Sequence, residues 1–147
     1  MEENFNEILD FFKNNIIEIL KAFILPTMIL ALHGLLSITN IYETIPWIDT
    51  PMHFFGGVTI GISYMLLLLL LHKKGHLGNI NNGLFIIAFA IGMVALTIVI
   101  WEFLEFSSDT IFGTNTQKSV MDTIKDLFLG LSGGTISCLI TYYSTRK

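Results

Sequence analysis

The stretch LFIIAFAIGMVALTIVIWEFLEF, residues 84–106, decides the fold of this chain. It carries no charged side chain before Glu102, and it has the roughly 20 residues that an α-helix needs to cross the hydrocarbon core of a bilayer. Three further stretches have the same character, at residues 17–38, 51–72 and 121–143. The sequence therefore predicts an all-α protein, a single integral membrane domain over residues 1–147 built as a four-helix bundle.

The composition agrees with a membrane protein. Hydrophobic residues make up 52% of the chain and charged residues 14%, whereas a soluble domain has about 25% charged residues. The net charge is −4, and the eight basic residues form no patch, which argues against a nucleic-acid partner. Membrane lipids are the expected partners.

Residues 4–16 precede the first span and have an amphipathic pattern. Their apolar side chains recur at helical spacing and are Phe5, Ile8, Leu9, Phe12 and Ile16. This pattern predicts an N-terminal amphipathic helix on the membrane surface. The alternative is that the same residues extend the first span, which contains Pro26.

Basic residues predict the orientation. Six lie at the two termini and in the second loop: Lys13, Lys21, Lys73, Lys74, Arg146 and Lys147. Only Lys118 and Lys125 lie in or beside the first and third loops. By the positive-inside rule, both termini are cytoplasmic, and the chain is a multi-pass protein of the cell (inner, cytoplasmic) membrane.

Three pairs of ionisable residues stand at the predicted extracytoplasmic ends of the spans: Asp49 and His53, Glu102 and Glu105, Asp122 and Asp126. Members of a pair are three or four residues apart, so they share a helix face. A charged side chain at the bilayer centre costs roughly 2.5 to 17 kcal/mol, depending on the method of estimate, so such groups need a reason to be there. Some of these residues also have an explanation that requires no shared site. Glu102 and Glu105 would cap their helix at the headgroups, and Asp122 would stabilise the N-terminus of its helix.

Glycines continue two of these faces. Gly57 and Gly61 follow His53 at steps of four, and Gly130 and Gly134 follow Asp126 in the same way. Because small residues let membrane helices approach closely, the second and fourth spans are predicted to touch along these glycines and to open into a polar pocket at the outer end.

The pocket predicts a bound cation or shared protons. Several carboxylates in a partly dry pocket repel one another, and few cationic side chains are near. Carboxylates with one histidine are ligands for a divalent ion such as Mg, Mn, Fe or Ca. The candidate ligands are Asp49, His53, Glu102, Glu105, Asp122 and Asp126. His33, on the first span, either adds a ligand or hydrogen-bonds a neighbouring group. Asp109, in the third loop, is expected to be solvated.

The same residues carry a family resemblance. Asp49-x-x-x-His53 followed by Gly56-Gly57, then Trp101-Glu102-x-x-Glu105, then Asp122-Thr123-x-x-Asp126-Leu127-x-x-Gly130 with Gly133-Gly134, resembles the YjdF-type bacterial inner-membrane family. The last element is also remotely similar to VanZ-like proteins, which are associated with glycopeptide (teicoplanin) resistance. The resemblance implies a polytopic membrane protein and supports the site.

Three functions remain open from the sequence. The first is divalent-cation binding, extended to a metal-dependent hydrolase or transferase that acts on a lipid or envelope precursor, with Glu102 or Glu105 as general base. The second is a proton- or cation-coupled transporter subunit, which would need a homo-oligomer because four spans are few for a carrier. The third is a structural or partner-binding membrane module whose polar cluster fixes helix register.

Overall fold

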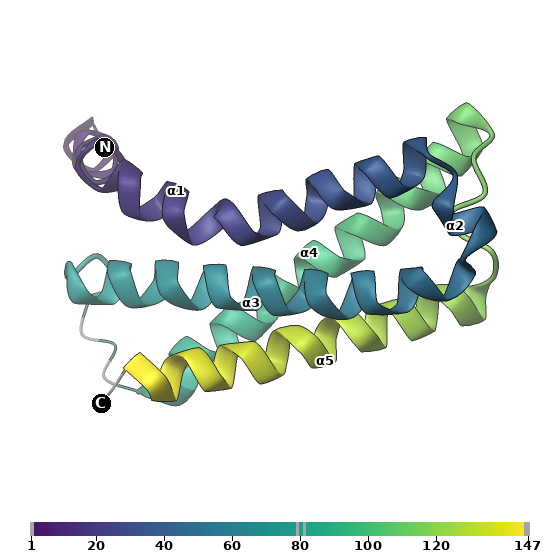
Figure 1. Ribbon diagram of the computed structural model, residues 1–147. Helices are drawn as coiled ribbons and strands as arrows, with labels where there is room; N and C mark the ends of the chain where they lie inside the picture. Colours follow the sequence, from purple (N-terminus) through teal and green to yellow (C-terminus); the bar gives the residue numbers. More distant parts are fainter. Residues whose placement is uncertain (1, 79, 81, 146–147) are drawn as a thin grey trace.

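Four long helices make up most of the part of this protein that the structure describes. The computed structural model describes residues 2–78, 80 and 82–145, with side chains from residue 10 onward. The elements are α1 (Glu2–Ile38), α2 (Ile41–Thr44), a 3-10 turn η1 (Pro46–Ile48), α3 (Asp49–Lys73), α4 (Gly83–Phe112) and α5 (Val120–Thr145) (Figure 1). Within the described residues, four segments are long and apolar enough to cross a membrane: Asp10–Ile38, Pro46–Lys73, Gly83–Phe112 and Val120–Thr145. The predicted all-α membrane bundle is confirmed.

The first helix is continuous from Glu2 to Ile38, which corresponds to the alternative in which residues 4–16 extend the first span. The side chains of Phe5, Ile8 and Leu9 lie outside the described residues, so the amphipathic pattern stays a prediction. The helix contains Pro26, and its ribbon is bent rather than straight (Figure 1). A proline removes one backbone hydrogen bond from a helix, and this is a common cause of such bends.

The third long helix extends further than the sequence predicts. Residues 107–112 were expected in a polar loop, but α4 continues to Phe112. Ser107 and Thr110 donate their hydroxyls to the carbonyls of Phe103 and Phe106, so these polar side chains are satisfied within the helix. Gly113 then ends α4 in the left-handed conformation, at φ 68°, which glycine adopts without steric cost.

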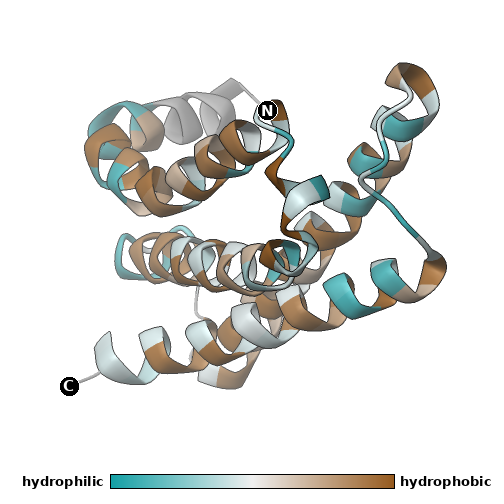
Figure 2. Ribbon diagram, turned by 45° about the vertical axis from the view of Figure 1, so that its right-hand side comes forward, coloured by the Kyte–Doolittle hydropathy of each residue, from teal (hydrophilic) through white to brown (hydrophobic). Residues whose placement is uncertain are grey.

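Helix α3 lies at the centre of the arrangement. It packs closely against α5 and also against α1 and α4, while α5 packs against α4 (Figure 1). Helix α1 packs mainly against α3 and is the most peripheral of the four. Figure 2 shows hydrophilic residues gathered where α4 ends and α5 begins, whereas the middles of the helices are hydrophobic.

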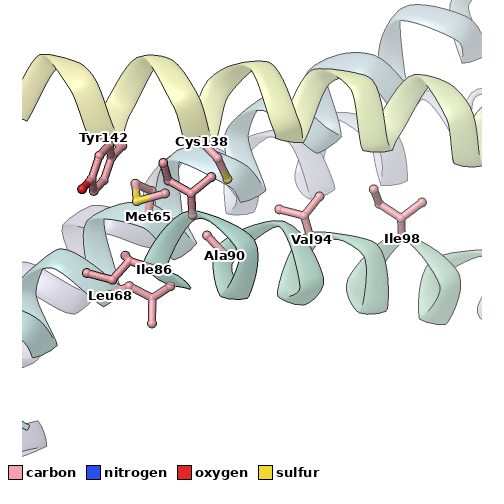
Figure 3. Close-up of a cluster of buried hydrophobic side chains, with 9 residues drawn as sticks. Met65, Leu68, Ile86, Ala90, Val94, Ile98, Cys138 and Tyr142 are labelled. Atoms are coloured by element: carbon pink, nitrogen blue, oxygen red, sulfur yellow. The ribbon is translucent and has the colours of Figure 1, made fainter. Parts of the chain in front are cut away.

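A compact apolar core joins α3, α4 and α5 away from that polar end. Its buried members are Met65, Leu68, Ile86, Ile87, Ala90, Val94, Ile98, Cys138 and Tyr142, most of them labelled in Figure 3. Cys138 is fully buried, and its thiol contacts the carbonyl of Gly61 at 3.5 Å. This cysteine is therefore a core residue, as its apolar sequence context indicates.

The predicted contact between the two rows of glycines is present. A Cβ built on Gly57 would stand 2.7 Å from the carbonyl carbon of Gly130 and 2.9 Å from its Cα, whereas ordinary van der Waals contact is 3.4–4 Å. A Cβ on Gly61 would be 2.5 Å from the carbonyl oxygen of Gly134. The backbones of α3 and α5 therefore touch directly, which only glycine permits.

Candidate functional site

His53 is the centre of the polar cluster. Its Nε2 lies 3.4 Å from Asp49 Oδ1, 3.9 Å from Asp126 Oδ2 and 4.0 Å from Glu105 Oε1. Its Nδ1 lies 3.8 Å from Glu102 Oε1. Five of the six residues predicted from the sequence are therefore brought together around one imidazole ring.

Three helices supply these side chains, each from its end at the same side of the bundle. Asp49 opens α3 and His53 follows one turn later, so both point to one face of that helix. Glu102 and Glu105 lie in the last three turns of α4, and Asp126 lies in the second turn of α5. The glycine contact one turn further along α3 and α5 sets how closely His53 and Asp126 approach.

The cluster is buried although it is ionisable. The side chain of His53 is 7% exposed, that of Asp126 4% and that of Glu102 6%. Glu102 Oε1 and Asp126 Oδ1 are inaccessible to solvent and have no hydrogen-bond partner within the described part of the chain. A buried oxygen of a charged group without a donor costs on the order of 1–3 kcal/mol or more. Asp126 Oδ1 has the Lys125 ammonium at 3.4 Å, so it is Glu102 Oε1 that points to a group outside the chain or to a shared proton.

Two donors orient the glutamates, and sequence reasoning missed both in this role. Trp101 donates its indole N–H to Glu105 Oε1 at 3.0 Å, one turn along the same helix. Gln117, in the loop between α4 and α5, donates to Glu102 Oε2 at 3.3 Å. The spacing of Trp101 and Glu105 by four residues could have indicated the first contact, but no sequence signal indicates the second.

Asp109 lies near the surface, and its carboxylate also holds that loop in place. It lies in the last turn of α4 and its carboxylate accepts bonds from the Thr114 hydroxyl at 2.6 Å and the Thr116 hydroxyl at 2.7 Å. It also accepts from the backbone N–H groups of Thr116 and Gln117, at 2.9 and 2.8 Å. Because these bonds fix residues 114–117, Asp109 positions the Gln117 side chain over Glu102.

Asp122, the sixth predicted residue, lies apart from the group around His53. Its carboxylate forms an ion pair with Lys125 at 2.7 Å, and Lys125 also lies 3.4 Å from Asp126 Oδ1. Asp122 is in the first turn of α5, where a lysine three residues later reaches it easily. Lys125 therefore links Asp122 to the cluster through charge rather than through a shared set of ligand atoms.

His33 forms a hydrogen bond with Tyr42 and packs against Trp101. Its Nδ1 is 2.8 Å from the Tyr42 hydroxyl, and its ring meets the Trp101 ring edge-on with centroids 4.8 Å apart. Burial, with smaller effects from Asp49 and Glu105, raises the pKa of Tyr42 well above its usual value, so its hydroxyl stays protonated. Of the two alternatives for His33, the geometry matches the hydrogen bond to a neighbour.

The arrangement offers two overlapping sets of potential ligand atoms. Asp49, His53 and Asp126 form one set, and His53, Glu102 and Glu105 form the other; within each set the ligand atoms lie within 4.8 Å of one another. Oxygen-rich sets with one imidazole suit hard or borderline divalent cations. Chemically, the site can hold a cation, exchange protons, or fix the three helices in register.

Comparison with known proteins assigns the chain to a family. Residues 8–147 match the family described as "Predicted membrane protein (DUF2238)". The chain belongs to the DUF2238 family. This confirms the YjdF-type resemblance, because that family is DUF2238, whereas no match supports the predicted similarity to VanZ-like proteins. Neither a curated protein nor a solved structure matches this DUF2238 chain.

Proposed function

We propose that this DUF2238 protein binds a divalent cation (Mg, Mn, Fe or Ca) at the extracytoplasmic end of its helical bundle. The observation that carries the proposal is the gathering of four buried or half-buried carboxylates within 3.4–4.0 Å of the His53 ring, among which the buried Glu102 Oε1 has no hydrogen-bond donor in the described part of the chain. A cation among these acids would offset their mutual repulsion.

The separations suit a single ion on the Nε2 side of the ring. Ligands bound at about 2.0–2.6 Å from an ion lie roughly 3–5 Å from one another. Asp49, Asp126 and Glu105 each have an oxygen 3.4–4.0 Å from His53 Nε2, inside that range. Asp49, His53 and Asp126, whose ligand atoms lie within 4.8 Å of one another, would hold the ion, with Glu105 near the same nitrogen and Glu102 on the Nδ1 side of the ring.

A hydrolase or transferase acting on a lipid or envelope precursor is the chemistry that we propose for such a site. The ion would activate a water molecule, and Glu102 would take its proton as general base. Glu102 suits this role better than Glu105, because its Oε1 is free of hydrogen bonds while Glu105 Oε1 accepts the Trp101 N–H. Release of a headgroup or phosphate from lipid vesicles with Mn²⁺, lost in Glu102→Gln, would test this step.

The proposal includes an orientation in the cell (inner) membrane with both termini cytoplasmic. The cluster lies at the end of the bundle opposite to the turn that carries Lys73 and Lys74, because successive spans run in opposite directions. By the positive-inside rule that turn is cytoplasmic and the cluster faces outward. Labelling of a single cysteine introduced at Gly75 from outside intact cells would contradict this orientation.

Direct measurement of metal binding tests the central proposal. Purified wild-type protein should bind Mn²⁺ in equilibrium dialysis or by electron paramagnetic resonance, and His53→Gln should lose most of this binding. His76→Gln is the matched control, because His76 is exposed at the other end of the bundle. Equal binding by the two variants, or no binding by the wild type, would rule out the proposed site.

A further inference from the structure

A second feature of the molecule adjoins the cluster on the side toward the bilayer centre. A cavity of about 100 Å³ lies among α1, α3 and α4, with His53 and Trp101 in its wall. Most of its wall is apolar, including Ile29, Met52 and Ile60. It is therefore an apolar space that reaches the same imidazole ring as the acids.

The two threonine side chains in this wall already have hydrogen-bond partners. The Thr97 hydroxyl donates to the Met93 carbonyl at 2.9 Å and contacts the Tyr64 hydroxyl at 2.8 Å. The Thr59 hydroxyl donates to the carbonyl of Gly56 at 3.0 Å. Because these groups are already satisfied, the cavity below His53 offers hydrocarbon rather than water a favourable environment.

The cavity opens sideways between α1 and α4. Helix α1 packs mainly against α3, so α1 and α4 do not close over this space by extensive packing of their own. Leu30 lines the cavity and is 54% exposed, which places an opening beside α1. The edge-on contact of His33 with Trp101 bounds the cavity toward the outer end. In a chain with four spans, the medium at this opening is lipid hydrocarbon.

We infer that the cavity takes a short segment of the hydrocarbon chain of a membrane lipid, next to its headgroup, and that it places the oxygen-rich linkage between chain and headgroup beside His53. The apolar wall, the opening at Leu30 and the position of His53 at the polar end together favour an amphiphile over a wholly apolar or wholly polar ligand. This inference rests on the proposed function for the role of the linkage, which the cation would bind. The binding of the lipid's hydrocarbon segment in the cavity does not depend on the cation.

Gly56 offers a way to fill the cavity without disturbing the helices. It lines the cavity, and a Cβ built there meets no atom within 4 Å. A leucine at this position would extend into the space that the lipid chain needs. Gly92, on α4, also has open space at its Cβ position but does not line the cavity, so Gly92→Leu is a matched control.

The experiment uses Trp101 as a reporter. The chain has two tryptophans, and Trp47→Phe leaves Trp101 as the only one; Trp47 is 70% exposed, so its removal is mild. The Trp47→Phe protein is reconstituted without added metal in phosphatidylethanolamine and phosphatidylglycerol vesicles, with acyl chains that carry bromine near the headgroup or carry none. Bromine quenches tryptophan fluorescence on contact.

The inference predicts strong quenching of Trp101 in the Trp47→Phe parent and in Gly92→Leu, and loss of most of it in Gly56→Leu. Gly56→Val, with a smaller side chain, should lose an intermediate share, and it replaces Gly56→Leu if circular dichroism shows that the leucine variant does not fold. Equal quenching in all folded variants would mean that only surrounding lipids reach Trp101, and it would overturn the inference.

The two proposals fail separately. Wild-type protein that binds no Mn²⁺ but shows quenching sensitive to Gly56 would overturn the metal site and support the chain-binding cavity. Protein that binds Mn²⁺ through His53 but shows quenching unaffected at Gly56 would overturn the cavity and support the metal site.

Discussion

Replacing Gly57 by alanine should force α3 and α5 apart. The new Cβ would stand 2.7 Å from the carbonyl carbon of Gly130, well inside the 3.4–4 Å of ordinary contact. The obstacle is backbone, which cannot rotate away, so we expect an overpacking cost near the upper end of about 1–3 kcal/mol. Alanine regains roughly 1 kcal/mol of helix propensity over glycine, which leaves Gly57→Ala destabilised by about 2 kcal/mol.

The neighbouring residue gives the comparison. Gly56→Ala meets nothing within 4 Å, so it should be neutral or stabilising by up to about 1 kcal/mol. Reversible unfolding of both variants in mixed detergent micelles measures the difference in stability, expected to be about 2–3 kcal/mol. Gly57→Ala should also weaken Mn²⁺ binding, because His53 and Asp126 lie one turn before the two touching glycines. Equal stabilities would refute direct backbone contact between these helices.

The remaining predictions concern the groups around the histidine. Trp101→Phe keeps an aromatic ring but removes the N–H donor to Glu105. Mn²⁺ affinity in equilibrium dialysis should therefore fall, and the free energy of unfolding should drop by roughly 1–3 kcal/mol. Unchanged values in both assays would show that the indole N–H does not orient Glu105. Asp109→Ala removes the acceptor of four loop hydrogen bonds, and limited proteolysis should cut the loop after α4 faster than in the wild type; an unchanged cleavage rate would contradict the anchoring role. Asp126→Asn should lose most Mn²⁺ binding while Asp122→Asn loses little, since the latter carboxylate pairs with a lysine outside the group; the reverse order would contradict the geometry.

Much of the fold follows from local rules. The length and apolarity of residues 84–106 require a spanning helix, and the same holds for the other three spans. Side chains three or four residues apart share a helix face, and spans that alternate in direction bring the three pairs to one end of the bundle. The meeting of His53 with Asp126 and with the two glutamates could therefore be predicted. Glycines at steps of four similarly predict the approach of Gly57 to Gly130.

The details that could not be predicted depend on where the chain turns. Asp122 shares a helix face with Asp126 by spacing, yet Lys125, in the second turn of α5, reaches back and pairs with its carboxylate. The extension of α4 to Phe112 depends on serine and threonine bonding back to their own helix, which competes closely with a loop. The contact of Gln117 with Glu102 needs the path of the loop that Asp109 fixes, and no periodicity encodes that path.

Main-chain contact between α3 and α5 has a consequence for ion choice. Where side chains separate two helices, rotamer changes can adjust the distances between ligands on the two helices. Where glycine backbones touch, as in α3 and α5, no side chain is present to make that adjustment. We therefore expect the position of His53 relative to Asp126 to be rigid, so that a bound ion must fit a fixed distance between the two side chains. Neighbouring ligands stand roughly 3 Å apart around Mg²⁺, with bonds of about 2.0–2.1 Å, and roughly 3.3–3.7 Å apart around Ca²⁺, with bonds of about 2.3–2.6 Å. The gaps of 3.4 and 3.9 Å from His53 Nε2 to Asp49 and Asp126 should therefore favour Ca²⁺ over Mg²⁺.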